Sequence, residues 1–494
     1  MNPNEKSAHL LRRFGLGASP GEMAAATKAG FEATLVRLLD PRYPAERVHP
    51  LRFTVRKDEP PEVASYLLRL HWVYHFLTTE TPLREKLALF WHDHFAVDDE
   101  NGGDGLMILS YVELLRRDPL GKFGDLLEQI AKNPAFMEML TMQNSTRVKP
   151  NENFARELLE LYTLGVGHYT ERDIQESARA FTGWTYLNRF WERQEVPMER
   201  RLQQLVDSGM NYAGFAFVPE FHDTGVKEIL GEKRAFSGEE LLEMIASREA
   251  CAEFITKKLW EFFAYPEPEK AVHQALVQTY RETDGSIRAV LETLARRPEF
   301  YSDQCVRQRI KSPVEYVVAI CRALGSATLL PPRIGLDRPH TEAIPEEGAS
   351  ILGGMAYWMS QCGQLLLRPP SVAGWEWGPG WVSTSNMVWR QKFDGMLTWE
   401  PKDKEKKVWG PAPGGQVMIR YFRERDPKSP DALVSILLRF FDCALGAEAH
   451  QALVETCQKN GGMQPYDSGN DNWFFGQIWH LYFLLRAAPE FHLC

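Results

Sequence analysis

The chain has 494 residues, of which 44% are hydrophobic and 25% are charged, and these proportions are those of an ordinary globular protein. The mean hydropathy is −0.35, and no apolar run approaches the ~20 residues that a membrane-spanning helix needs, so the sequence predicts no membrane span. The net charge of −9 argues against a general nucleic-acid binder, because neutralising phosphates requires a basic surface.

Two features of the sequence indicate the cellular compartment of the protein. The first residues, MNPNEKSAHLLRRFGLG, place charges where an export signal needs its apolar segment, so we expect a cytoplasmic protein. The seven cysteines are odd in number and widely spaced, without a CxxC pair. They predict free thiols rather than a zinc site or a redox motif.

Helix start signals recur along the chain, whereas strand signals are sparse. In each signal a serine or threonine precedes an acidic residue by three positions, the pattern of a capping box. The four clearest signals are Ser19 to Glu22, Thr170 to Asp173, Ser237 to Glu240, and Ser312 to Glu315. The sequence therefore predicts an all-α fold, a large multi-helix core joined by long irregular loops.

A helix predicted over 82–96 carries two histidines that flank an aspartate. At 100° per residue, His94 lies on the apolar stripe of the helix and His92 lies about 160° away from it. A regular helix cannot direct both rings at one ion. Each histidine is either a ligand or acid–base group, or a core histidine bonded to a backbone group.

The helix predicted over 151–164 carries Glu157 and Glu160 on a stripe beside its apolar face. Two carboxylates at this spacing can reach a single metal centre in a helical bundle. Glu157 lies nearer the apolar face, so its charge needs compensation by a cation or a hydrogen-bond donor. The alternative is that Arg156, Arg179 or Lys149 forms ion pairs with these glutamates.

The segment Phe221-His222-Asp223-Thr224-Gly225, followed by Lys227, forms a polar group in a predicted loop. His222 and Asp223 supply a nitrogen and an oxygen that suit iron, manganese or zinc, or they form an acid–base pair. Lys227 is a candidate for binding substrate. The alternative is an aspartate that stabilises a turn.

A rigid segment, LRPPSVAGWEWGPGW, covers 367–381. Its prolines and glycines fix the backbone, and its tryptophans offer stacking area. Arg368 and Trp375 are candidates for lining a substrate cleft. Alternatively, the tryptophans fill the join between two helical lobes.

Composition also predicts the domain layout. We expect a main helical domain over 1–325 that carries the polar site, a linker over 326–348, and a carboxy-terminal helical part over 349–494 that folds back on the core. Residues 401–415, rich in charge, proline and glycine, predict an exposed loop.

Several motifs, in order along the chain, resemble the bacterial family known as domain of unknown function 1800. These are HLLRRFGLGASP, LREKLALFWHDHFAV, NENFARELLELYTLGVGHYTERDIQESARAFTGW, FHDTGVKEILG, ITKKLWEFF, KSPVEYVVAICRALG and LLLRPPSVAGW. The resemblance covers most of the chain. It implies a mainly helical fold and a role for the matched polar residues, but it brings no established reaction. Many relatives resemble exported proteins accompanied by a sulfatase-like protein, which the resemblance implies as a partner, although this chain shows no export signal.

Three functions fit these patterns. The first is a metal-dependent enzyme, with iron or manganese favoured over zinc because the predicted ligands are histidines and carboxylates. We then expect redox chemistry with dioxygen or a peroxide. Its predicted metal ligands are His92, His94, Glu157, Glu160 and His222, and its predicted catalytic residues are Glu157, His222 and Asp223.

The second function is a metal-dependent phosphoester hydrolase, suggested by the His-Asp doublets at 92–93 and 222–223. The third is a non-catalytic helical scaffold, in which the same polar residues bond to one another and the tryptophan segment binds a protein partner.

Overall fold

The computed structural model describes residues 2–40, 61–103, 105–186, 214–330, 346–393, 399–403, 408–459 and 471–494. The protein is all-α, as the sequence predicts, and its described strands form three two-stranded antiparallel sheets. The buried apolar residues form a continuous cluster that runs from Leu10 to Phe491. Among the described residues, no helix is long and apolar enough to cross a bilayer.

The four predicted capping boxes are confirmed. Ser19, Thr170, Ser237 and Ser312 each accept a hydrogen bond from the backbone N–H three residues later, and the acidic side chain there bonds back to the capping residue. These bonds satisfy backbone groups that a helix start otherwise leaves unpaired.

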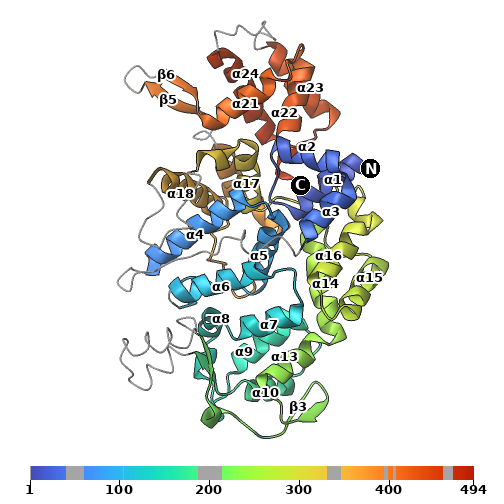
Figure 1. The fold of residues 1–494 in the computed structure, drawn as a ribbon, viewed down its shortest axis with the longest axis vertical. Coiled ribbons are helices and arrows are strands. Elements are labelled where there is room, and N and C mark those ends of the chain that lie inside the picture. Colours follow the sequence, from blue (N-terminus) through green and yellow to red (C-terminus); the bar gives the residue numbers. More distant parts are fainter. Residues whose placement is uncertain are drawn as a thin grey trace.

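The amino-terminal helices surround one central helix, α5 (Figure 1). Helix α5 contacts α1, α3, α4 and α6, and all of its residues are buried. The bounds are α1 (Pro3–Phe14), α2 (Pro20–Ala29), α3 (Phe31–Leu39), α4 (Pro61–Thr78), α5 (Pro82–His94) and α6 (Gly105–Arg117). Because α5 has no solvent-exposed face, each polar side chain on it needs a partner within the protein.

A second group of elements lies below α5 in Figure 1. It contains α7 (Phe123–Ala131), α8 (Pro134–Met139), α9 (Glu152–Glu157), α10 (Glu171–Ala180) and α13 (Gly238–Ala246). Two short antiparallel sheets accompany them, one of β1 (Trp184–Tyr186) with β2 (Phe215–Phe217), and one of β3 (Lys227–Ile229) with β4 (Glu232–Arg234). Strand β3 packs on α10, which places the segment after His222 beside that helix.

Three further helices pack in sequence along one side of the molecule (Figure 1). They are α14 (Glu249–Phe263), α15 (Lys270–Glu282) and α16 (Ile287–Arg296). Helix α14 also contacts the turn Leu158–Thr163, which follows α9. This contact forms one wall of the candidate site described below.

The carboxy-terminal part folds back on the core. It contains α18 (Glu346–Gln361), α19 (Thr384–Lys392), β5 (Trp399–Asp403), β6 (Val408–Pro411), α21 (Pro413–Arg423), α22 (Pro430–Phe440), α23 (Ala447–Lys459) and α24 (Asp471–Ala487). Helix α17 (Pro313–Ala323) precedes it, at the end of the predicted main domain. Helix α18 packs against α4, and α17 contacts both helices. Most of the predicted linker, residues 331–345, lies outside the described residues.

The expectation of an exposed loop over 401–415 needs correction. Strands β5 and β6 pair as an antiparallel hairpin, and α21 begins at Pro413 with Ala412, Gly414 and Gly415 buried. Charged residues and prolines are compatible with a short two-stranded hairpin, because both of its strands are edges. Composition alone therefore does not distinguish such a hairpin from a loop.

Candidate functional site

His92 is a core histidine whose two ring nitrogens both have partners. Its Nε2 accepts a hydrogen bond from the backbone N–H of Leu367 at 3.2 Å, so Nδ1 carries the proton and faces the hydroxyl of Tyr111 at 3.1 Å. The ring is fully buried, and burial lowers the pKa of His92 to about 3. His92 therefore stays neutral and links α5 to the 367–381 segment.

His94 faces a different set of partners. Its Nε2 lies 3.0 Å from the backbone carbonyl of Tyr162, which can only accept, so the proton resides on Nε2. Its Nδ1 accordingly accepts a hydrogen bond from Nζ of Lys258, also at 3.0 Å. Burial and the nearby Lys258 hold the pKa of His94 well below its usual value. As the helical geometry predicts, the two histidines of α5 face different surroundings.

Asp93, between the two histidines, anchors the tryptophan segment. Its Oδ1 accepts from the backbone N–H of Trp375 at 2.7 Å, and its Oδ2 accepts from the indole N–H of Trp377 at 2.6 Å. Burial raises the pKa of Asp93 to about 6 in spite of these two donors. At Gly374 the backbone has a φ of +85°, and a Cβ there would lie 2.5 Å from Oδ1 of Asp93.

The helix expected over 151–164 changes its geometry at Glu157. Residues Leu158–Thr163 form a π-helical turn, in which the N–H of Leu164 bonds to the carbonyl of Leu159. The wider turn departs from the 100° progression used to predict that Glu157 and Glu160 share one stripe, but the two carboxylates still interact electrostatically. Single π turns are frequent at functional sites.

The two glutamates have different surroundings. Glu160 accepts a hydrogen bond from the hydroxyl of Tyr169 at 2.6 Å. Glu157 has no ion pair or hydrogen bond among the described residues, and burial together with Glu160 raises its pKa. The arginine that could have paired with them, Arg156, bonds to Glu171 instead.

His94 and Glu160 share a cavity of about 710 Å³ between α5, the π turn and α14, which we call the α5–α14 cavity. Lys258 lines it beside His94, and Ala373 contributes from the tryptophan segment. The remaining lining residues are Leu161, Leu164, Gly165, Val166, His168, Ala250, Glu253, Phe254, Lys257, Glu261, Glu267 and His273. This volume is within the range of about 300–1,000 Å³ found for small-molecule sites.

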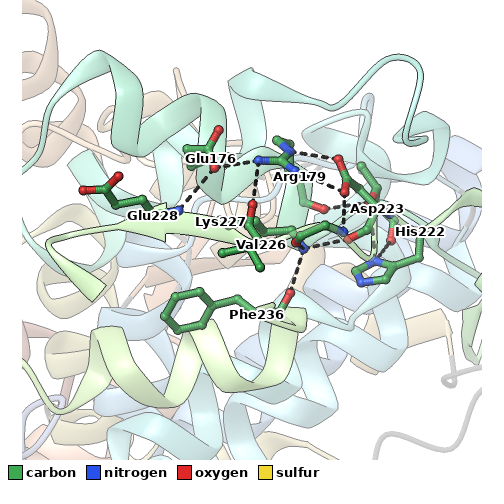
Figure 2. Close-up of polar contacts among 10 residues, drawn as sticks. Glu176, Arg179, His222, Asp223, Val226, Lys227, Glu228 and Phe236 are labelled. Atoms are coloured by element: carbon green, nitrogen blue, oxygen red, sulfur yellow. Dashed lines mark hydrogen bonds and ion pairs between the residues drawn. The ribbon is translucent and has the colours of Figure 1, made fainter. Parts of the chain in front are cut away.

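Residues Arg179, Thr182, His222, Asp223 and Lys227 form a separate group, which we call the Asp223 cluster (Figure 2). Nε of Arg179 lies 2.8 Å from Asp223, and this contact lowers the pKa of the aspartate. Nδ1 of His222 faces the carbonyl of Thr182 at 2.8 Å. The cluster is therefore held together largely by its own contacts.

Lys227 is satisfied by backbone groups. Its Nζ donates to the carbonyls of Asp223, Gly225 and Phe236 at 2.6, 3.1 and 3.1 Å, and Figure 2 shows the side chain turned into the cluster. The residue is only 1% exposed. This placement supports a role in fixing the loop rather than the predicted role in binding substrate.

The predicted substrate residues of the 367–381 segment also have protein partners. Arg368 forms ion pairs with Asp99 and Glu100. Trp375 is buried, and its ring packs edge-on against His92 with the centroids 5.2 Å apart. These contacts favour the alternative in which the tryptophans fill a join between helices.

The predicted metal ligands do not form one site. Only His94 and Glu160 line the α5–α14 cavity, and the ring nitrogens of His94 already have partners. Over the described ranges, no three His, Cys, Asp or Glu side chains are placed to hold a metal ion. The metal-dependent functions therefore stay predictions.

Comparison with known proteins identifies the family. The family model "Protein of unknown function (DUF1800)" matches residues 9–493. The chain belongs to this family. No curated protein and no solved structure gives a match. The DUF1800 match includes every element that lines the cavity and every residue of the Asp223 cluster.

Lys258 was not singled out from the sequence of this DUF1800 chain, and Asp93 was considered only as part of the His-Asp doublet at 92–93. Lys258 lies four residues from both Phe254 and Phe262 on α14, so it interrupts an apolar helical stripe. A lysine on such a stripe needs a partner or a cavity, and that signal was present in the sequence. The contacts of Asp93 with Trp375 and Trp377 join residues over 280 positions apart, which no local pattern reveals.

Proposed function

We propose that the protein is an enzyme that moves protons to or from a small molecule held in the α5–α14 cavity, with Lys258 and His94 as the reacting pair. The observation that carries the proposal is the 3.0 Å contact between Nζ of Lys258 and Nδ1 of His94 at the cavity wall. Acid–base groups in enzymes are held within such hydrogen-bond reach of one another and of the substrate.

The direction of this hydrogen bond is fixed. The carbonyl of Tyr162 retains the proton of His94 on Nε2, so Nδ1 presents a lone pair to Lys258. Lys258 forms no ion pair within 4 Å among the described residues, and burial lowers its pKa although the charges of Asp93 and Glu261 act in the opposite direction. A lysine in this state loses a proton more readily than a surface lysine.

The surroundings support the same proposal. Titratable groups that line a cleft and have perturbed pKa values are candidates for catalysis. The π turn that supplies the Tyr162 carbonyl is a further feature that functional sites favour.

Lysine acylation tests the proposal. The full-length protein is pulsed with acetic anhydride between pH 6 and pH 10, and the modified lysines are quantified by peptide mass spectrometry. Lys258 should reach half-maximal labelling at a lower pH than Lys257, whose pKa is raised by its bond to Glu267. Equal midpoints for the two lysines would contradict the proposal.

Ligand binding provides a second measurement. A small-molecule library is screened by thermal shift against the wild type, Lys258→Met and Lys270→Met. Lys270 is exposed at the start of α15, outside the cavity. Compounds that stabilise the wild type should lose their effect in Lys258→Met and keep it in Lys270→Met.

The other expectations stay predictions. The cytoplasmic location, the sulfatase-like partner, and metal-dependent redox or hydrolytic chemistry each call for their own measurement. For the metal, that measurement is the metal content of the purified protein.

A further inference from the structure

The amine of Lys258 differs from that of its neighbour in the chain. Nζ of Lys257 lies 2.9 Å from Glu267 and 3.8 Å from Glu261. Nζ of Lys258 bonds to the neutral His94 and lies 5.3 Å from the centre of the Phe254 ring. Lys257 is thus paired with two carboxylates at short range. Lys258 meets an imidazole, an aromatic ring and the cavity, and the charges of Asp93 and Glu261 act on it only from beyond ion-pair distance.

The contact with His94 orients the amine for attack. An uncharged amine that donates one N–H to Nδ1 of His94 retains its lone pair for another partner, and the cavity is the space open to it. Burial favours this uncharged form. Lysines activated in this way are the nucleophiles of imine-forming enzymes.

The charges of the cavity wall restrict the substrate. Four glutamates line the cavity, Glu160, Glu253, Glu261 and Glu267, against the two lysines 257 and 258. Lys257 is already paired with two of these glutamates. A substrate with a carboxylate or phosphate group would meet like charge, whereas a neutral or cationic one would not.

From this arrangement we infer that the α5–α14 cavity takes an uncharged or cationic aldehyde or ketone, which condenses with the amine of Lys258 to form an imine. This inference deepens the proposed function and rests on it.

The step balances without a further reactant. The nitrogen lone pair of Lys258 forms a bond to the carbonyl carbon as the C=O π electrons move to oxygen. His94 takes a proton from the resulting ammonium through Nδ1 and returns it to the oxygen. The hydroxyl group then accepts a proton from solvent and leaves as water while the nitrogen lone pair forms the C=N bond, and the remaining N–H proton of the iminium returns to solvent, so no net proton is consumed.

Reductive trapping tests the inference. The full-length protein is incubated at pH 7 with sodium cyanoborohydride and either butanal, a neutral probe, or glyoxylate, an anionic one. Peptide mass spectrometry then measures the alkylation of each lysine. With butanal, Lys258 should be modified several-fold faster than Lys257, and with glyoxylate this preference should fall. Equal rates for the two lysines with butanal, or a stronger preference with glyoxylate, would overturn the inference.

Two variants refine the test. Glu261→Gln removes one wall charge and should raise glyoxylate labelling of Lys258 relative to butanal labelling. His94→Gln should slow the labelling of Lys258 without changing that of Lys257. If His94→Gln fails to fold, the comparison of the two lysines in the wild type still decides the question.

The acylation experiment distinguishes a failure of the imine inference from a failure of the proton-transfer proposal. A low labelling midpoint for Lys258 without preferential trapping would reject the imine and leave the proton-transfer proposal intact. If Lys258 and Lys257 reach half-maximal acylation at the same pH, both the imine inference and the proton-transfer proposal are rejected.

Discussion

The α5–α14 cavity and the Asp223 cluster both gather charged side chains, but they satisfy them differently. In the Asp223 cluster, Arg179 pairs with Asp223, and Lys227 donates to three backbone carbonyls. In the cavity, Lys258 bonds to one neutral imidazole. The dense polar motif thus belongs to a well-bonded loop, whereas the lysine that we propose to react lies on a helix and bonds to one imidazole.

The largest effect should come from breaking the Asp223 cluster. Lys227→Met leaves three carbonyls without their donor, and we expect a loss of about 3 kcal/mol or more in the free energy of unfolding. Urea denaturation measures this loss. Lys233→Met, on the exposed strand β4 nearby, should stay within about 0.5 kcal/mol of the wild type. A small loss in Lys227→Met would show that the cluster does not stabilise its loop.

The next effect is a pH dependence from Asp93. Because its folded-state pKa is raised from 3.8 to about 6, its contribution to stability is fully present below pH 4 and is lost as the pH rises through 6. As the pH rises through this range, the free energy of unfolding of the wild type should fall by about 3 kcal/mol relative to that of Asp93→Asn. Urea denaturation of both proteins from pH 4 to pH 7 tests this. A constant difference would show that Asp93 does not titrate in this range.

Removing the cavity lysine should cost little stability. Lys258→Met loses one hydrogen bond but also removes a charge whose burial is unfavourable, so we expect a change of less than about 1 kcal/mol. The losses in free energy of unfolding of Lys258→Met and Lys227→Met, measured side by side, compare the cavity with the Asp223 cluster directly. A loss as large as that of Lys227→Met would make Lys258 a structural residue.

The smallest effect should come from Glu157→Gln. Glu157 has no ion pair to lose among the described residues, and its raised pKa means that its ionised form is disfavoured in the folded state at pH 7. The variant should be as stable as the wild type or slightly more stable, by under about 1 kcal/mol. Asp223→Asn, which loses the Arg179 pair, is the matched comparison and should be clearly less stable. A loss in Glu157→Gln as large as that in Asp223→Asn would reveal an ion pair of Glu157.

What could be predicted from sequence depended on the range of the interaction. The all-α fold and the four helix starts followed from capping residues and their neighbours, and the opposed directions of His92 and His94 followed from helical geometry. The π turn after Glu157 was not predictable from local patterns, and it contacts α14, which lies far along the chain. The same holds for the role of His222 and Asp223, since the partner that decides it, Arg179, lies on another element.

The anchoring of Asp93 by Trp375 and Trp377 has a consequence for how the protein is made. The carboxylate and its first partner are 282 positions apart, and at typical rates of about 5–20 residues per second their synthesis is separated by roughly 15–60 s. During that interval α5 has emerged from the ribosome without the segment that covers Asp93 and supplies Ala373 to the cavity. The amino-terminal helices can therefore pair early, but the cavity is closed only when the chain is nearly four-fifths complete.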